Sequence, residues 1–136
     1  IEIRDHVGAE NMLIFGLTAE QVAERRAAGL DATAAIAASP VLSDVLNAVE
    51  SGVFSPEDRG RYRGLVENLR HHDHFMVTAD FDAYWSAQRA AGTLWQDRSG
   101  WDRKAILNTA RTGLFSADRA ILDYARNIWG AEPGEH

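Results

Sequence analysis

The sequence predicts a mainly α-helical chain with a few short strands, and three local patterns support this prediction. Helix-starting residues stand before most of the amphipathic segments, residues 32–38 are rich in alanine, and the apolar run Met12–Phe15 has the length of a strand. A chain of 136 residues with 46% hydrophobic residues is long enough to bury a core. We therefore expect residues 1–136 to form a single, partial domain.

The first three residues, Ile1–Ile3, alternate between apolar and polar, as a half-buried strand does. The chain does not begin with methionine, and a natural chain rarely opens inside a strand. We therefore expect a fragment of a larger protein.

The next segment is predicted to be a strand followed by a helix. Met12–Phe15 is continuously apolar, which is typical of a strand covered on both faces, and Gly16 ends it. Thr18 and Gln21 have the spacing of a capping box, and Gly29 supplies a left-handed residue at the end of the helix.

Three further helices follow. Residues 32–38 favour a helix because alanine is the best helix former, and Pro40 suits the first turn of a second helix that reaches about Glu50. The run Ser55–Asp58 combines a hydroxyl acceptor, a proline and two acids, which is typical of a helix start. This third helix is expected to end near Arg70.

The remaining elements are predicted to be a short extended piece at Phe75–Val77 and three more helices. Asp80, Ser99 and Ser116 are each expected to cap one of these helices, because short polar side chains accept from the free amides of a first turn. The expected ranges are 81–97, 99–113 and 116 to about 130.

The last helix carries an apolar stripe with the spacing of one buried face, at Ile121, Tyr124, Ala125 and Ile128. The complete prediction has seven helices and at most three short strands. Glu132–His136 is interpreted as a polar tail.

Composition excludes several classes of function. The net charge of −6 argues against a nucleic-acid surface or an anionic membrane, because lysine and arginine dominate both kinds of binding. The sequence has no cysteine, so no disulfide framework is possible, and a cytoplasmic location fits. The uninterrupted apolar runs are far shorter than a membrane span requires, so we expect no transmembrane segment.

The only cluster with metal-ligand residue types is His71, His72, Asp73 and His74. His72 and His74 point the same way only in an extended segment, and the sequence offers no third ligand. The alternative is a helix end, where histidines meet the negative pole of the helix dipole. We favour the helix end and expect no metal.

Other chemistry-bearing side chains have structural interpretations. Asp80 and Asp82 resemble a carboxylate pair for acid–base work, but their place at a predicted helix start favours capping. The four tryptophans have the ring surface to stack on sugars, but they lie among apolar residues of predicted helices, and most of them are expected to be core anchors: Trp85, Trp95, Trp101 and Trp129.

The sequence resembles the glycogen/α-glucan (maltodextrin) phosphorylase family along nearly its whole length. The motifs that carry the resemblance are Trp101–Asn108, Phe115–Arg119, Tyr124–Gly130, Ile14–Thr18 with Glu20 and Val22, Ser51–Pro56 and Asp80–Tyr84. They match the carboxyl end of that family in order and in approximate spacing. The resemblance implies the C-terminal part of a Rossmann-like α/β domain in a B-type (GT-B) glycosyltransferase fold.

The resemblance also implies a function for the full-length parent. Such enzymes are cytoplasmic homodimers that cleave α-1,4-glucan with inorganic phosphate, release glucose 1-phosphate and carry pyridoxal phosphate on a lysine. That lysine is expected upstream of Ile1, and Lys104, the only lysine here, matches a helix near the carboxyl end instead. No catalytic, cofactor-binding or metal-binding residue is therefore assigned in this chain.

The fragment itself is expected to bind no cofactor and to be inactive, and it is expected to self-associate through the apolar Met12–Phe15 segment. The alternative is a free-standing helical protein-interaction module that shares the scaffold sequence.

Overall fold

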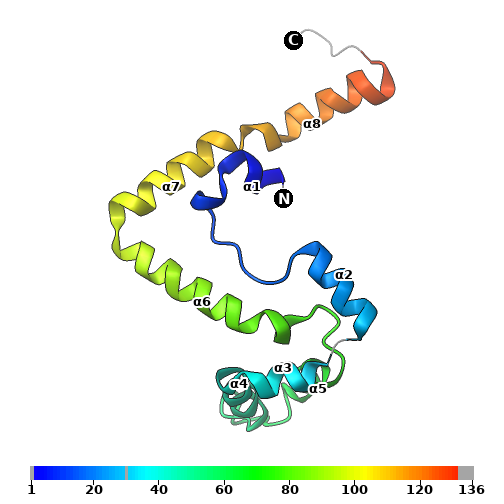
Figure 1. Ribbon diagram of the computed structural model, residues 1–136, viewed down its shortest axis with the longest axis vertical. Coiled ribbons are helices and arrows are strands. Elements are labelled where there is room, and N and C mark those ends of the chain that lie inside the picture. The colour runs from blue at the N-terminus through cyan, green and yellow to red at the C-terminus, as the bar shows by residue number, and fades with distance from the viewer. Residues whose placement is uncertain (1, 30, 132–136) are drawn as a thin grey trace. The chain divides into compact units, whose positions relative to one another are not determined.

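The computed structural model describes residues 2–29 and 31–131, and in these ranges the chain forms helices and no strand (Figure 1). The elements in chain order are α1 (Glu2–Val7), η1 (Ala9–Asn11), α2 (Ala19–Ala28), α3 (Ala32–Ala38), α4 (Pro40–Glu50), α5 (Arg63–His71), α6 (Val77–Gln96), α7 (Arg98–Arg111), η2 (Gly113–Phe115), α8 (Ala117–Tyr124) and η3 (Ala125–Trp129).

The expectation of a few short strands is wrong. Glu2 and Ile3 belong to helix α1, and Ile1 lies outside the described residues. Met12–Phe15 is irregular, and the side chains of Leu13, Ile14 and Phe15 are about half exposed. A strand needs a neighbouring strand to pair its main chain, and no described segment of this chain supplies one.

The third expected strand, Phe75–Val77, is a tight turn that leads into α6. Asp73 and Met76 both have positive φ, at 34° and 58°, and both are buried. The Asp73 carboxylate accepts from the main-chain N–H of Val77 at 2.9 Å and from the main-chain N–H of Thr78 at 2.9 Å. These bonds start α6 four residues before the expected position and leave no extended segment.

Contacts divide the chain into two compact units. Unit 1 comprises residues 1–14 and 91–136, and unit 2 comprises residues 15–90. Helix α6 contributes to both units, because the division falls between Ala90 and Ala91.

The core of unit 2 lies where α3, α4 and α5 contact one another. Its buried cluster consists of Ile36, Leu42 and Leu46, with Leu69 and Phe81 packed against it. The predicted starts of both early helices are confirmed, since Pro40 opens α4 and the alanine-rich segment forms α3.

Helix α2 begins with the predicted capping box. The Thr18 side chain accepts from the Gln21 N–H at 3.3 Å, and the Thr18 N–H donates to Gln21 Oε1 at 2.9 Å. A hydrogen bond from its own main-chain N–H, and a second one with the Thr18 side chain, hold the pKa of the Glu20 carboxyl below its ordinary value. Gly29 follows the helix with φ of 85°, as predicted.

The helix expected from Ser55 begins later than predicted, at Arg63. Asp58 Oδ1 accepts from the Gly60 N–H at 3.1 Å, and this local bond favours a turn over a helix. Residues 51–62 consequently form a series of turns, and Ser55 is buried among them.

The capping residues of the later helices are only partly as predicted. Ser116 caps α8 by accepting from the Arg119 N–H at 3.3 Å, as expected. Asp97 takes the role expected of Ser99, accepts from the Gly100 N–H at 3.0 Å and starts α7 at Arg98.

Unit 1 is built around α7, which contacts α1, η1 and η2. Val7 at the end of α1 is completely buried. Helix α8 continues into the π-helical turn η3, which ends at Gly130 in the left-handed conformation.

No single described helix is long and apolar enough to cross a membrane. Helices α3 and α4 together meet the length and composition criteria, but the chain bends by 109° between them.

Gly16 allows the main chain to approach α6. Its φ is 85°, and a Cβ atom on this residue would lie 2.7 Å from the Asp80 carboxylate carbon. Asp80 Oδ1 accepts from the N–H of the next residue, Leu17, at 2.9 Å. The close approach of the main chain to α6 is therefore possible because glycine has no Cβ atom.

We predict that Gly16→Ala lowers the free energy of unfolding by about 2–3 kcal/mol, through positive φ and the clash with Asp80. Gly92→Ala is the control, because a Cβ atom meets nothing within 4 Å there, in the interior of α6. It should add about 0.5–1 kcal/mol. Urea unfolding followed by circular dichroism measures both, and equal stability of the two variants would contradict the prediction.

Candidate functional site

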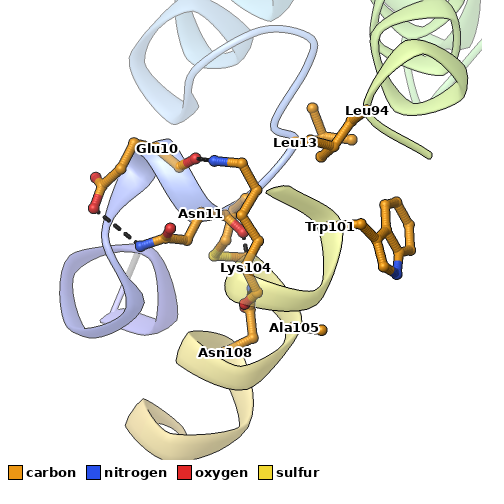
Figure 2. A pocket seen from close by; sticks show the side chains of 9 residues that line it. Glu10, Asn11, Leu13, Leu94, Trp101, Lys104, Ala105 and Asn108 are labelled. Atoms are coloured by element: carbon orange, nitrogen blue, oxygen red, sulfur yellow. Dashed lines mark hydrogen bonds between the residues drawn. The ribbon is translucent and has the colours of Figure 1, made fainter. Parts of the chain in front are cut away.

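The best-formed cavity of unit 1 lies between the η1 region and α7 (Figure 2). Its volume is about 220 Å³, and apolar side chains make up most of its walls. The lining residues are Glu10, Asn11, Met12, Leu13, Leu94, Trp101, Lys104, Ala105 and Asn108.

Three polar side chains of α7 bind the main-chain carbonyls of α1 and η1, and we call them the α7 ladder: Lys104, Asn108 and Arg111. Lys104 Nζ donates to the carbonyl oxygen of Glu10, as Figure 2 shows. Asn108 Nδ2 donates to the carbonyl oxygen of Asn11 at 2.8 Å. The ladder therefore satisfies carbonyls that have no partner within their own short helices.

The third member of the α7 ladder is Arg111, whose Nη1 donates to the carbonyl oxygen of Val7 at 2.9 Å. The same oxygen accepts from Asn11 Nδ2 at 2.9 Å. Sequence reasoning missed this arrangement. The available signal was the spacing of the three side chains, at i, i+4 and i+7, which places them on one face of a helix.

The cavity is suited to binding and docking rather than to catalysis. Its lining contains no serine, cysteine or histidine to act as nucleophile or base. The Lys104 ammonium is held by a main-chain carbonyl, and the Glu10 carboxylate accepts from Asn11 Nδ2 at 3.0 Å. Its charged groups therefore hold the fold together.

Asp80 and Asp82, the two carboxylates considered for acid–base work, each make a hydrogen bond to a different partner. Asp80 binds the Leu17 amide, and Asp82 Oδ1 accepts from the Ser39 hydroxyl at 2.6 Å. Ser39 Oγ in turn accepts from the Leu42 N–H and caps α4. Neither carboxylate caps α6 as expected, because Asp73 supplies the acceptors at that helix start.

Comparison with known proteins places this arrangement in context. The carbohydrate phosphorylase family matches residues 1–131. The chain is 38% identical over 135 residues to the brain form of glycogen phosphorylase from Homo sapiens, and this match covers 99% of the chain. It is 41% identical over 133 residues to glycogen phosphorylase from Synechocystis sp., covering 98% of the chain.

The chain belongs to the carbohydrate phosphorylase family. The resemblance found in the sequence motifs is thus confirmed. The muscle form of glycogen phosphorylase from Bos taurus is 38% identical over 133 residues. The chain spans 16% of the length of each of these curated relatives.

In this phosphorylase-family chain the histidine cluster at residues 71–74 lies at the end of α5, as favoured. His71 is in the last turn of α5, and His72 is its C-cap residue. His74 packs edge-on against Phe75, with ring centroids 5.0 Å apart. Among the described residues, no three histidine or acidic side chains are placed to share a metal ion.

Three of the four tryptophans are not the core anchors that the sequence predicts, and Trp101 is partly buried. Trp85, Trp95 and Trp129 are each more than 40% exposed. Trp95 contacts Trp101 edge-on at 4.9 Å and lies under the Arg98 guanidinium at 4.4 Å. One ring face of Trp95 is therefore already covered by an arginine.

We predict that Arg111→Ala lowers the free energy of unfolding of unit 1 by about 1.5–3 kcal/mol, the usual value of a hydrogen bond to a charged group. Arg103→Ala is the matched control, because Arg103 is an exposed arginine on the same helix. It should change stability by less than about 0.5 kcal/mol. Amide hydrogen exchange at residues 4–11 reports the loss, and equal protection in both variants would contradict it.

Proposed function

We propose that this chain is the C-terminal segment of an α-glucan phosphorylase and forms the C-terminal portion of its cofactor-binding domain. The longer protein would be a cytoplasmic homodimer. It would release glucose 1-phosphate from α-1,4-glucan by phosphorolysis with inorganic phosphate, using pyridoxal phosphate. The B-type glycosyltransferase fold is the architecture proposed for that parent.

The observation that carries this proposal is the extent of the family match. It runs through residues 1–131, and the chain corresponds to only 16% of each glycogen phosphorylase relative. A match of this extent supports a segment of a longer phosphorylase over a free-standing helical interaction module. Nothing in the comparisons favours that alternative.

Pyridoxal phosphate does not fit the cavity around Lys104. The Lys104 ammonium is held by the Glu10 carbonyl, and the lining contains no arginine or histidine to bind a phosphate group. No step of phosphorolysis is therefore assigned to residues of this chain. Its proposed contribution is a scaffold, in which α7 holds the segment that leads into the chain from upstream.

We predict that the 136-residue chain forms no glucose 1-phosphate from maltodextrin and phosphate, with or without pyridoxal phosphate. The native gene product that contains the chain should form it. In that product Lys104→Arg should keep kcat within about twofold, because arginine also donates to the Glu10 carbonyl. A coupled glucose 1-phosphate assay measures these activities.

Turnover by the 136-residue chain would contradict the proposed division of roles. A loss of activity of more than tenfold in a folded Lys104→Arg protein would contradict the structural role of Lys104. Reduction with borohydride in the presence of pyridoxal phosphate, followed by peptide mapping, checks whether Lys104 forms an imine.

Self-association of the isolated chain is the second part of the proposal. Leu13, Ile14 and Phe15 are consecutive apolar residues and all are about half exposed. Contiguous exposed apolar surface drives association in water.

We predict that the isolated chain sediments as a concentration-dependent oligomer and that Ile14→Lys shifts it toward monomer. Ile106→Lys is the control, because Ile106 is 67% exposed on α7 and does not belong to this run. Sedimentation velocity measures the distributions. A wild-type monomer at high concentration would refute the prediction.

A further inference from the structure

Unit 2 contains a groove that neither the family match nor the α7 ladder explains, and we call it the aromatic groove. It has a volume of about 340 Å³. Five of its lining residues are apolar or aromatic, and Asp80 is the only charged one: Phe15, Phe75, Val77, Asp80, Phe81 and Tyr84.

The walls of the groove are held in place by specific contacts. Phe15 and Tyr84 pack edge to face, with ring centroids 5.2 Å apart. Asp80 Oδ1 accepts from the Leu17 N–H at 2.9 Å and ties the irregular segment after Phe15 to α6. Phe81 also packs on the buried cluster of unit 2. The groove is therefore a fixed feature of unit 2.

Phe75 projects from the rim of this groove because the turn before α6 fixes its direction. Its neighbour Met76 has φ of 58° and is only 2% exposed, and Asp73 is buried with both carboxylate oxygens bonded to the first turn of α6. Phe75 itself is 79% exposed. Phe15, Val77 and Tyr84 of the groove are each more than 40% exposed as well, and a contiguous exposed apolar patch of this kind marks an interaction surface.

We propose that the aromatic groove is a docking site for an apolar segment of the polypeptide that surrounds this chain in a longer phosphorylase. This inference rests on the proposed function. The relatives are about six times longer than the chain, since the chain spans 16% of their length, so most of such a protein lies outside it. Among the described residues of unit 2, more large apolar side chains are exposed than buried.

The chemistry of the groove defines its occupant. Aliphatic or aromatic side chains match the apolar walls, and an acidic segment is excluded because it would approach the Asp80 carboxylate. A second copy of this chain is the alternative occupant, and the concentration dependence measured below distinguishes the two.

The test compares the reactivity of a cysteine at the groove in the isolated chain and in the native gene product. The chain has no cysteine, so Phe75→Cys introduces its only thiol. Phe54→Cys is the matched control, because Phe54 is 65% exposed in unit 2 and does not line the groove. Iodoacetamide labelling rates are measured by mass spectrometry of the peptide that carries each cysteine.

In the dilute isolated chain, both thiols should react quickly and at similar rates. In the native gene product, the thiol at position 75 should react at least tenfold more slowly, independently of protein concentration, and the thiol at position 54 should be slowed less. Equal protection at both positions, or no protection at position 75, would overturn the proposal.

Two further outcomes also overturn it. Protection at position 75 that grows with the concentration of the isolated chain would identify a second copy as the occupant. A native gene product no longer than this chain would remove the proposed occupant. A longer product that protects position 75 but forms no glucose 1-phosphate would support docking and refute only the proposed enzyme activity.

Discussion

Main-chain groups at the ends of short helices and turns must find hydrogen-bond partners, and in this chain the two longest helices supply them. In unit 1, Lys104, Asn108 and Arg111 of α7 bind carbonyls of residues 7–11, about one hundred positions earlier in the sequence. In unit 2, Asp80 and Asp82 of α6 bind the Leu17 amide and the Ser39 hydroxyl. Long-range polar contacts help to close each unit, because the buried cluster of unit 2 has three members and Val7 is the only buried hydrophobic residue among the described residues of unit 1.

This use of polar side chains bears on function. Lysine and aspartate are among the residues with which enzymes build nucleophiles, acids and bases. Here each makes a hydrogen bond that fixes the local fold. A chain whose reactive side chains are committed in this way fits the proposed role of scaffold within a carbohydrate phosphorylase.

The exposed apolar surface has a physical cause. The stripe of α8 and η3 has helical spacing, yet Ile121, Tyr124 and Ile128 are each more than half exposed. Amphipathic spacing shows that a face is built for burial, but not which polypeptide buries it. The predictions that this stripe is buried and that most tryptophans anchor the core are therefore wrong for this chain, because no described segment of it covers those faces.

Local sequence determined most of the helices of this protein. The capping box at Thr18, the proline of α4 and the Ser116 cap are interactions within four residues, so their patterns are readable without any knowledge of the fold. The family motifs could likewise be recognised from short stretches of sequence. Only the tertiary structure decided the conformation of Met12–Phe15, the first residue of α6 and the role of Lys104. Met12–Phe15 finds no neighbouring strand among the described residues, α6 starts at the buried Asp73 turn, and Lys104 binds the carbonyl of Glu10, so each outcome depends on contacts made by the fold.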